Sequence, residues 1–290
     1  MNLVMPDVKV LAGVNVRGAA ASPLGRYVLT QMIERNQQIQ QASTDFGVDP
    51  HSLREILVAS NSAPKYDAGI AVARGSFHPP AVIAKAVEHG AVTEMYKNVT
   101  LVTDSKHGLG LAFLGSNLLI TGDLPSVKNA IDRALAPWAM PAPLSARIAQ
   151  LSAADDAWVI STVSAATLLP TSTATAGTAR GVSPASVLQN VQRMSGGVKF
   201  GKLATVNALA QADTPEMAQL LGNTVKLMMN LLQAQAKQLA PESAQSLVVD
   251  PEGNLLNLSF HLTDPEFRNL YKLVSGSSRV AGTPKAEKKM

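Results

Sequence analysis

Residues 98–135 read NVTLVTDSKHGLGLAFLGSNLLITGDLPSVKNAIDRAL, and this stretch shows the unit that recurs along the chain. Short apolar strands are followed by a polar turn, a proline and an amphipathic helix. Val127, Ile131 and Leu135 recur at helical spacing, whereas large and small side chains alternate over 109–114, as is typical of a strand. The stretch therefore predicts antiparallel strands followed by a helix that folds back over them.

The same order of strand, polar residues, proline and helix returns several times. Proline fixes φ and lacks an N–H, so it ends a strand's hydrogen-bond ladder and suits the first turn of a helix. The prolines at these predicted junctions are Pro23, Pro79, Pro125, Pro215 and Pro265. We predict an α+β fold with antiparallel sheets covered by helices on one face. The β-α-β-β-α-β order up to residue 102 is compatible with a ferredoxin-like split unit.

Three prolines between residues 137 and 143 indicate the main internal boundary. We expect an N-terminal α+β half (1–138), a proline-rich linker (139–150), a similar C-terminal α+β half (151–275) and a disordered basic tail (276–290). The expected elements of the C-terminal half are a Ser/Thr/Ala-rich loop over 164–182, a helix from Ser183 through Met194, a long helix over 215–240 and a hairpin over 247–262.

The composition excludes several classes of protein. The 290 residues contain no cysteine, which excludes disulfides, cysteine-ligated zinc, iron–sulfur clusters and cysteine nucleophiles. The net charge of +4 comes partly from the tail, and no folded element carries the basic stripe of a nucleic-acid binder. We find no apolar run long enough for a membrane-spanning helix. The start, MNLVMPDVKV, lacks the basic segment and apolar core of a signal peptide.

A longer region is similar to exported bacterial proteins of unknown function. It carries REILVASNS, GIAVARGSFHPPAVIAKAVEHG, YKNVTLVTDS and GLGLAFLGSNLLITGDLPSVKNAIDRA in this order, after the start MPDVKVLAGVNV and SPLGRYVL. The resemblance covers about residues 4–135 and brings no activity, cofactor or catalytic residue. It implies a periplasmic or otherwise exported protein whose signal peptide preceded Met1. The cytoplasm is the alternative compartment.

Arg74 is the charged residue that most resembles a binding residue. It lies in ARGSF, at the end of a predicted strand and before a helix, where a guanidinium could hold a carboxylate or phosphate. It could equally pair with a nearby acid such as Glu55 or Asp67, and we favour this second interpretation.

The long helix offers a second candidate. Its Met217 and Met228 could line a pliable apolar groove, although core packing is the interpretation we favour. No metal ligands or catalytic residues are predicted, because the histidines at 51, 78, 89, 107 and 261 show no ligand spacing. The adjacent Asp155 and Asp156 are interpreted as exposed turn residues rather than as a carboxylate pair.

Three functions stay open from the sequence. The first is a non-enzymatic binding or interaction protein of a bacterial envelope, with a protein partner or a second copy of itself. The second is a carrier that holds a small apolar ligand between the sheet and the helix over 215–240. The third, which we rank last, is an enzyme with a carboxylate- or arginine-based site.

Overall fold

The computed structural model describes residues 3–35, 40, 43–44, 47–61, 69–106, 108–136, 138–164, 191–235 and 246–269. They belong to two compact units. Unit 1 comprises Met1–Val163 and Met194–Gly201, and unit 2 comprises Ser164–Arg193 and Lys202–Met290. Within the described residues, no helix combines the length and the apolar character that crossing a bilayer requires.

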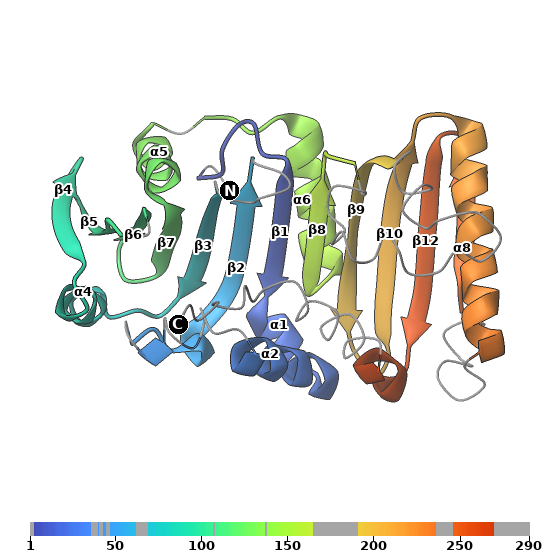
Figure 1. Cartoon of the computed structure of the whole chain (residues 1–290), viewed down its shortest axis with the longest axis horizontal. Coiled ribbons are helices and arrows are strands. Elements are labelled where there is room, and N and C mark those ends of the chain that lie inside the picture. Colours follow the sequence, from blue (N-terminus) through green and yellow to red (C-terminus); the bar gives the residue numbers. More distant parts are fainter. Residues whose placement is uncertain are drawn as a thin grey trace, which may run out of the picture. The chain divides into compact units, whose positions relative to one another are not determined.

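Unit 1 is built on an antiparallel sheet (Figure 1). Its elements are β1 (Val10–Asn15), α1 (Val16–Ala20), α2 (Pro23–Arg35), the 3-10 helix η1 (Pro50–Ser52), β2 (Leu53–Ser60), β3 (Gly69–Gly75), α4 (Pro79–Glu88), β4 (Val92–Tyr96), β5 (Val99–Asp104), β6 (Leu109–Phe113), β7 (Leu118–Asp123), α5 (Leu124–Leu135), α6 (Ala142–Ala154), β8 (Ala157–Ser161) and most of β9 (Val191–Phe200). The strands follow the order β9-β8-β1-β2-β3-β7-β6-β5-β4.

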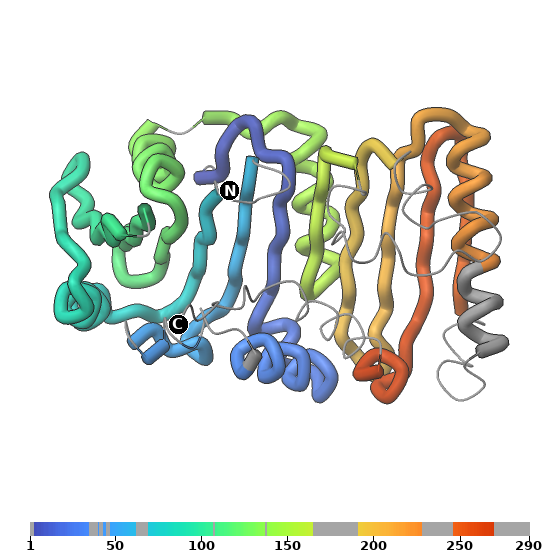
Figure 2. The backbone as a smooth tube through the Cα atoms, viewed as in Figure 1, coloured from blue at the N-terminus to red at the C-terminus, as the bar shows by residue number. Residues whose placement is uncertain are grey.

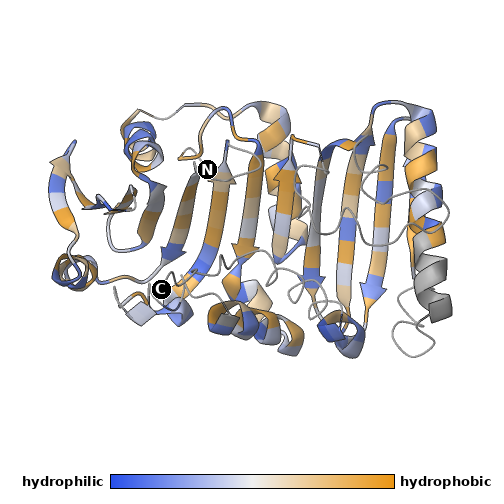
Figure 3. Cartoon of the chain, viewed as in Figure 1, coloured by the Kyte–Doolittle hydropathy of each residue, from blue (hydrophilic) through white to orange (hydrophobic). Residues whose placement is uncertain are grey.

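The main core of unit 1 lies on the face of its sheet that α5 and α6 cover. Leu11 of β1 and Ile120 of β7 are fully buried there, together with Ile131 of α5 and Ile148 of α6. The other face of the central strands is apolar as well but less buried: Ala12 lies there between Val58 and Val159, and Val58 is 47% exposed. Strands β1 and β8 are accordingly apolar along most of their length (Figure 3).

Unit 2 contains β10 (Ala204–Ala212), α8 (Pro215–Gln235), β11 (Val248–Glu252) and β12 (Leu255–Leu262). Its described strands pair in the antiparallel order β10-β12-β11. Figure 2 shows the chain passing from β10 into the start of α8. Helix α8 approaches the strands closely at Gly222, where a Cβ would lie 3.1 Å from Val249 and 3.2 Å from Leu256.

The predicted α+β class with antiparallel pairing is confirmed, and Pro79, Pro125 and Pro215 open a helix that follows a strand, whereas Pro23 follows helix α1. Pro23, Pro79, Pro125 and Pro215 all lie in the first turn of a helix. The ferredoxin-like detail is not confirmed. A split unit leaves a strand between the two that flank its helix, whereas β1 pairs directly with β2 from Val10 to Asn15.

One local prediction is wrong, and one short helix was not predicted. The helix expected through Met194 is strand β9 over its described part, because Met194 pairs with Ser161 of β8. Helix α1 was not predicted; the side chain of Asn15 accepts a hydrogen bond from the N–H of Gly18 at 2.8 Å and caps this helix directly after β1. The expected loop beyond Ser164 and the tail over 276–290 lie outside the described residues.

The stretch expected to be a linker, 139–150, contains most of α6. Ile148 and Leu151 of this helix are buried in the core of unit 1. The boundary expected near residue 138 therefore falls inside unit 1.

Candidate functional site

Arg74 forms a local ion pair. Its Nη1 lies 3.2 Å from Oε2 of Glu55, the residue opposite it in the register between β2 and β3. Both side chains are more than half exposed. They lie at the edge of a hollow of about 310 Å³ that Trp158 also lines. Arg74 therefore pairs with a nearby acid, which is the second of the two interpretations given above.

The methionine candidates of α8 lie far apart along the helix. Met217 is 36% exposed, and the side chain of Met228 lies outside the described residues. The described part of α8 borders a hollow of about 190 Å³, lined mainly by polar side chains such as Gln219 and Asn223. A methionine groove therefore stays a prediction.

The remaining polar candidates are dispersed or structural. Among the described residues, no three His, Cys, Asp or Glu side chains come together as a metal site. The prediction that Asp155 and Asp156 are exposed turn residues is wrong, because both side chains are buried. Asp156 accepts hydrogen bonds from Nζ of Lys199 at 2.7 Å and from the N–H of Phe200 at 2.9 Å, and thereby fixes β8 to β9.

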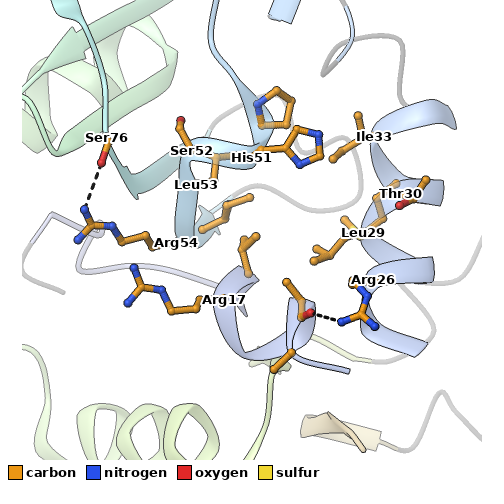
Figure 4. A pocket seen from close by; sticks show the side chains of 16 residues that line it. Arg17, Arg26, Leu29, Thr30, Ile33, His51, Ser52, Leu53, Arg54 and Ser76 are labelled. Carbon is orange, nitrogen blue, oxygen red and sulfur yellow. Dashed lines mark hydrogen bonds between the residues drawn. The ribbon is translucent and has the colours of Figure 1, made fainter. Parts of the chain in front are cut away.

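A groove of about 680 Å³ lies in unit 1 between α1, α2 and the start of β2 (Figure 4). Its walls are apolar along α2 and at the entry to β2. We call it the α1–α2–β2 groove, and it is lined by Val16, Arg17, Ala20, Ala21, Arg26, Leu29, Thr30, Met32, Ile33, Pro50, His51, Ser52, Leu53, Arg54, Ile56 and Ser76. Its volume lies within the range of small-molecule sites, roughly 300–1,000 Å³.

Local sequence signals build the helical wall of this groove. The hydroxyl of Ser22 accepts a hydrogen bond from the N–H of Gly25 at 2.9 Å and starts α2. Gly25 allows α2 to approach α1, since a Cβ there would lie 2.1 Å from the carbonyl oxygen of Ala19. Leu24 and Val28 are buried on one face of α2. The neighbouring Leu29 and Ile33 are left half-buried at the groove.

The opposite wall comes from η1 and β2. The carboxylate of Asp49 accepts a hydrogen bond from the N–H of His51 at 2.9 Å, which fixes η1 just before β2 begins. Leu53 and Ile56 then add half-buried apolar surface. The hydroxyl of Ser52 donates to the carbonyl oxygen of Asp49 at 2.7 Å, so it is not presented to His51 as a nucleophile.

The charges of the groove have one sign. Arg17, Arg26 and Arg54 line it and are exposed. Nη1 of Arg26 donates to the carbonyl oxygen of Ala20 at 2.9 Å, and Nη2 of Arg54 donates to the hydroxyl of Ser76 at 3.1 Å. In the described part of the chain, no carboxylate lines the groove and none of the three arginines forms an ion pair. The groove is therefore apolar inside and cationic at its edge.

A second hollow of about 510 Å³ adjoins the groove, because Ser52 and Ser76 line both. It lies beside the start of α4 and carries His78 and Lys85. No arginine of the groove is among the site residues predicted from the sequence. Arg17 and Arg54 come from different elements, and the contact between these elements cannot be predicted from the sequence.

Comparison with known proteins adds information on the fold only. No family model and no curated protein matches the sequence. Solved structures of a protein designated TP0453 are similar. Crystal form III superposes with a TM-score of 0.62 at 7% identity and covers 94% of this chain and 97% of that one. Forms IV and I give TM-scores of 0.57 and 0.56, both at 8% identity, with coverage of 93% and 94% of this chain and 95% and 96% of the other.

Proposed function

We propose that this chain is a non-enzymatic binding protein of a bacterial cell envelope, and that the α1–α2–β2 groove holds a small, largely apolar molecule. The observation that carries the proposal is a hollow of about 680 Å³ with apolar walls on both sides. The side chains that form these walls, including Leu29 and Leu53, are half-buried. Such a surface stays in contact with water until a ligand covers it.

The envelope part of the proposal has separate support. The sequence resembles exported bacterial proteins over about residues 4–135, and a resemblance of this kind favours an exported chain. None of the motifs described above is an enzyme signature, and the groove offers apolar contact rather than a nucleophile with its base. Binding to a protein partner or to a second copy stays a prediction.

The site can be tested with a neutral apolar dye. N-phenyl-1-naphthylamine should bind the full chain saturably, with a rise in fluorescence as it leaves water. Leu29→Gln should weaken binding about tenfold, because the dye loses apolar contact with one leucine side chain. Leu135→Gln is the matched control: it changes a leucine that is 60% exposed at the end of α5, outside the groove, and should leave binding unchanged.

Two results would contradict the proposal. One is dye binding that does not saturate. The other is equal weakening by Leu29→Gln and Leu135→Gln. Circular dichroism on both variants would show that each retains the native helix and strand content.

A further inference from the structure

We propose that the groove selects an anionic single-chain amphiphile, such as a free fatty acid, and that Arg17 and Arg54 bind its headgroup. This inference rests on the proposed function and identifies the class of ligand. Arg17 comes from α1 and Arg54 from β2, so two separate elements bring a guanidinium to the same groove. Their guanidinium ends project to the same side of the groove in Figure 4.

The three arginines of the groove differ in what they can offer. Arg26 lies on the other side in Figure 4 and donates to the carbonyl oxygen of Ala20 at 2.9 Å. Arg54 donates to Ser76 through Nη2, which leaves the N–H groups of its other nitrogens for a ligand. Among the described contacts, Arg17 has no hydrogen bond or ion pair of its side chain. Arg17 and Arg54 are therefore the arginines best placed to receive an anion.

Charge complementarity selects the sign of the headgroup. Lining carboxylates would neutralise the arginines, but within the described residues the groove contains none. An anion near Arg17 and Arg54 gains charge-assisted hydrogen bonds, and guanidinium groups match the geometry of a carboxylate or phosphate. A cationic headgroup would be repelled at the same place.

The apolar walls of the groove indicate what the part of the ligand beyond its headgroup must be. Leu29, Ile33 and Leu53 line the same groove and present aliphatic surface (Figure 4). The described lining contains no phenylalanine, tyrosine or tryptophan on which a nucleotide base could stack. An aliphatic chain with an anionic end fits both parts of the groove.

The experiment compares three single-chain ligands with alkyl chains of closely similar length and different headgroups. Decanoate, 1-decanol and decyltrimethylammonium would each displace N-phenyl-1-naphthylamine from the full chain, below their micelle concentrations. We expect decanoate to displace the dye at a concentration about tenfold lower than 1-decanol, and the cation to be the weakest. The preference for decanoate over 1-decanol should fall as NaCl is raised from 50 to 500 mM, because salt screens exposed charges.

Substitutions then test whether Arg17 and Arg54 cause the preference for decanoate over 1-decanol. Arg17→Gln/Arg54→Gln should abolish the preference for decanoate over 1-decanol. The matched control is Arg74→Gln, which removes an exposed arginine that is paired with Glu55 and does not line the groove. This control should keep the preference.

The outcomes separate the two proposals. Saturable dye binding with equal displacement by decanoate and 1-decanol would overturn the headgroup inference and leave the proposed function standing. A preference that survives Arg17→Gln/Arg54→Gln, or that salt does not change, would also overturn the inference. Failure of the dye to bind saturably would overturn both. The salt series uses the unaltered chain and so decides the matter even if the double variant does not fold.

Discussion

Replacing Gly13 by alanine tests how tightly the central strands of unit 1 are packed. Gly13 of β1 lies opposite Trp158 of β8, and the indole is only 7% exposed. A Cβ on Gly13 would lie 2.4 Å from Cε2 and Cζ2 of Trp158 and 2.7 Å from its Nε1. Side-chain atoms cannot approach so closely, so the indole or the strand must move.

Two opposing effects determine how much Gly13→Ala changes the free energy of unfolding. Overpacking a well-filled core costs about 1–3 kcal/mol, and a clash with a rigid buried ring belongs at the upper end of that range. Alanine in a strand interior gains about 0.5–1 kcal/mol over glycine. Gly13→Ala should therefore lower the free energy of unfolding by about 2 kcal/mol. In a Trp158→Leu background the clash is gone, and the same substitution should be neutral or stabilising.

The matched control is Gly110→Ala in β6. A Cβ there would lie 3.3 Å from Cδ1 of Leu124, the flexible end of a side chain that can shift. This variant should change the free energy of unfolding by less than about 1 kcal/mol.

Urea unfolding followed by tryptophan fluorescence measures these values. Both tryptophans, Trp138 and Trp158, belong to unit 1, so the signal reports on that unit. In the Trp158→Leu background Trp138 alone provides the signal. The packing argument fails if Gly13→Ala costs less than about 0.5 kcal/mol, or if it costs the same with and without Trp158.

Two further predictions concern the ends of α5. Asp123 caps this helix by accepting from the N–H of Ser126 at 2.9 Å, and it also accepts from the N–H of Gly69 at 2.6 Å. Asp123→Ala should therefore cost about 1–2 kcal/mol in urea unfolding, and an unchanged midpoint would refute this role. Near the other end, the hydrogen bond from Lys97 is the main cause that lowers the pKa of Asp132 from its ordinary 3.8. The stability that this carboxylate contributes is complete above pH 3.8 and is lost as the pH falls through its lowered pKa. The Tm of Asp132→Asn should accordingly fall below that of the unaltered chain at pH 6 and approach it at pH 2.5, and an equal difference at both pH values would contradict the prediction.

Features with local causes could be predicted from the sequence. The helix α5 follows from a capping aspartate, a proline and apolar residues at helical spacing, and its Val127 and Ile131 are fully buried as that spacing requires. Strand β12 likewise follows from alternation, which buries Leu256 and Leu262.

Features with distant causes could not be predicted. The spacing of Val191 and Met194 suits a helix, but both residues lie in strand β9, where Met194 pairs with Ser161 of β8. Asp156 looks like a turn residue until Lys199 and the N–H of Phe200 are brought to it. The arginines of the groove belong to the same class, because their proximity depends on how α1 meets β2.

Strand β1 lies between β2 and β8 in the sheet of unit 1, so its two partners are synthesised at different times. Val10 pairs with Ser60 on one side and with Ser161 on the other. On a ribosome, the first partner is available early, whereas the second emerges only after α5 and α6 have been synthesised. Until then one edge of an apolar strand stays open, and open edges recruit foreign strands. We therefore expect a fragment that ends before β8 to aggregate more readily than the full chain.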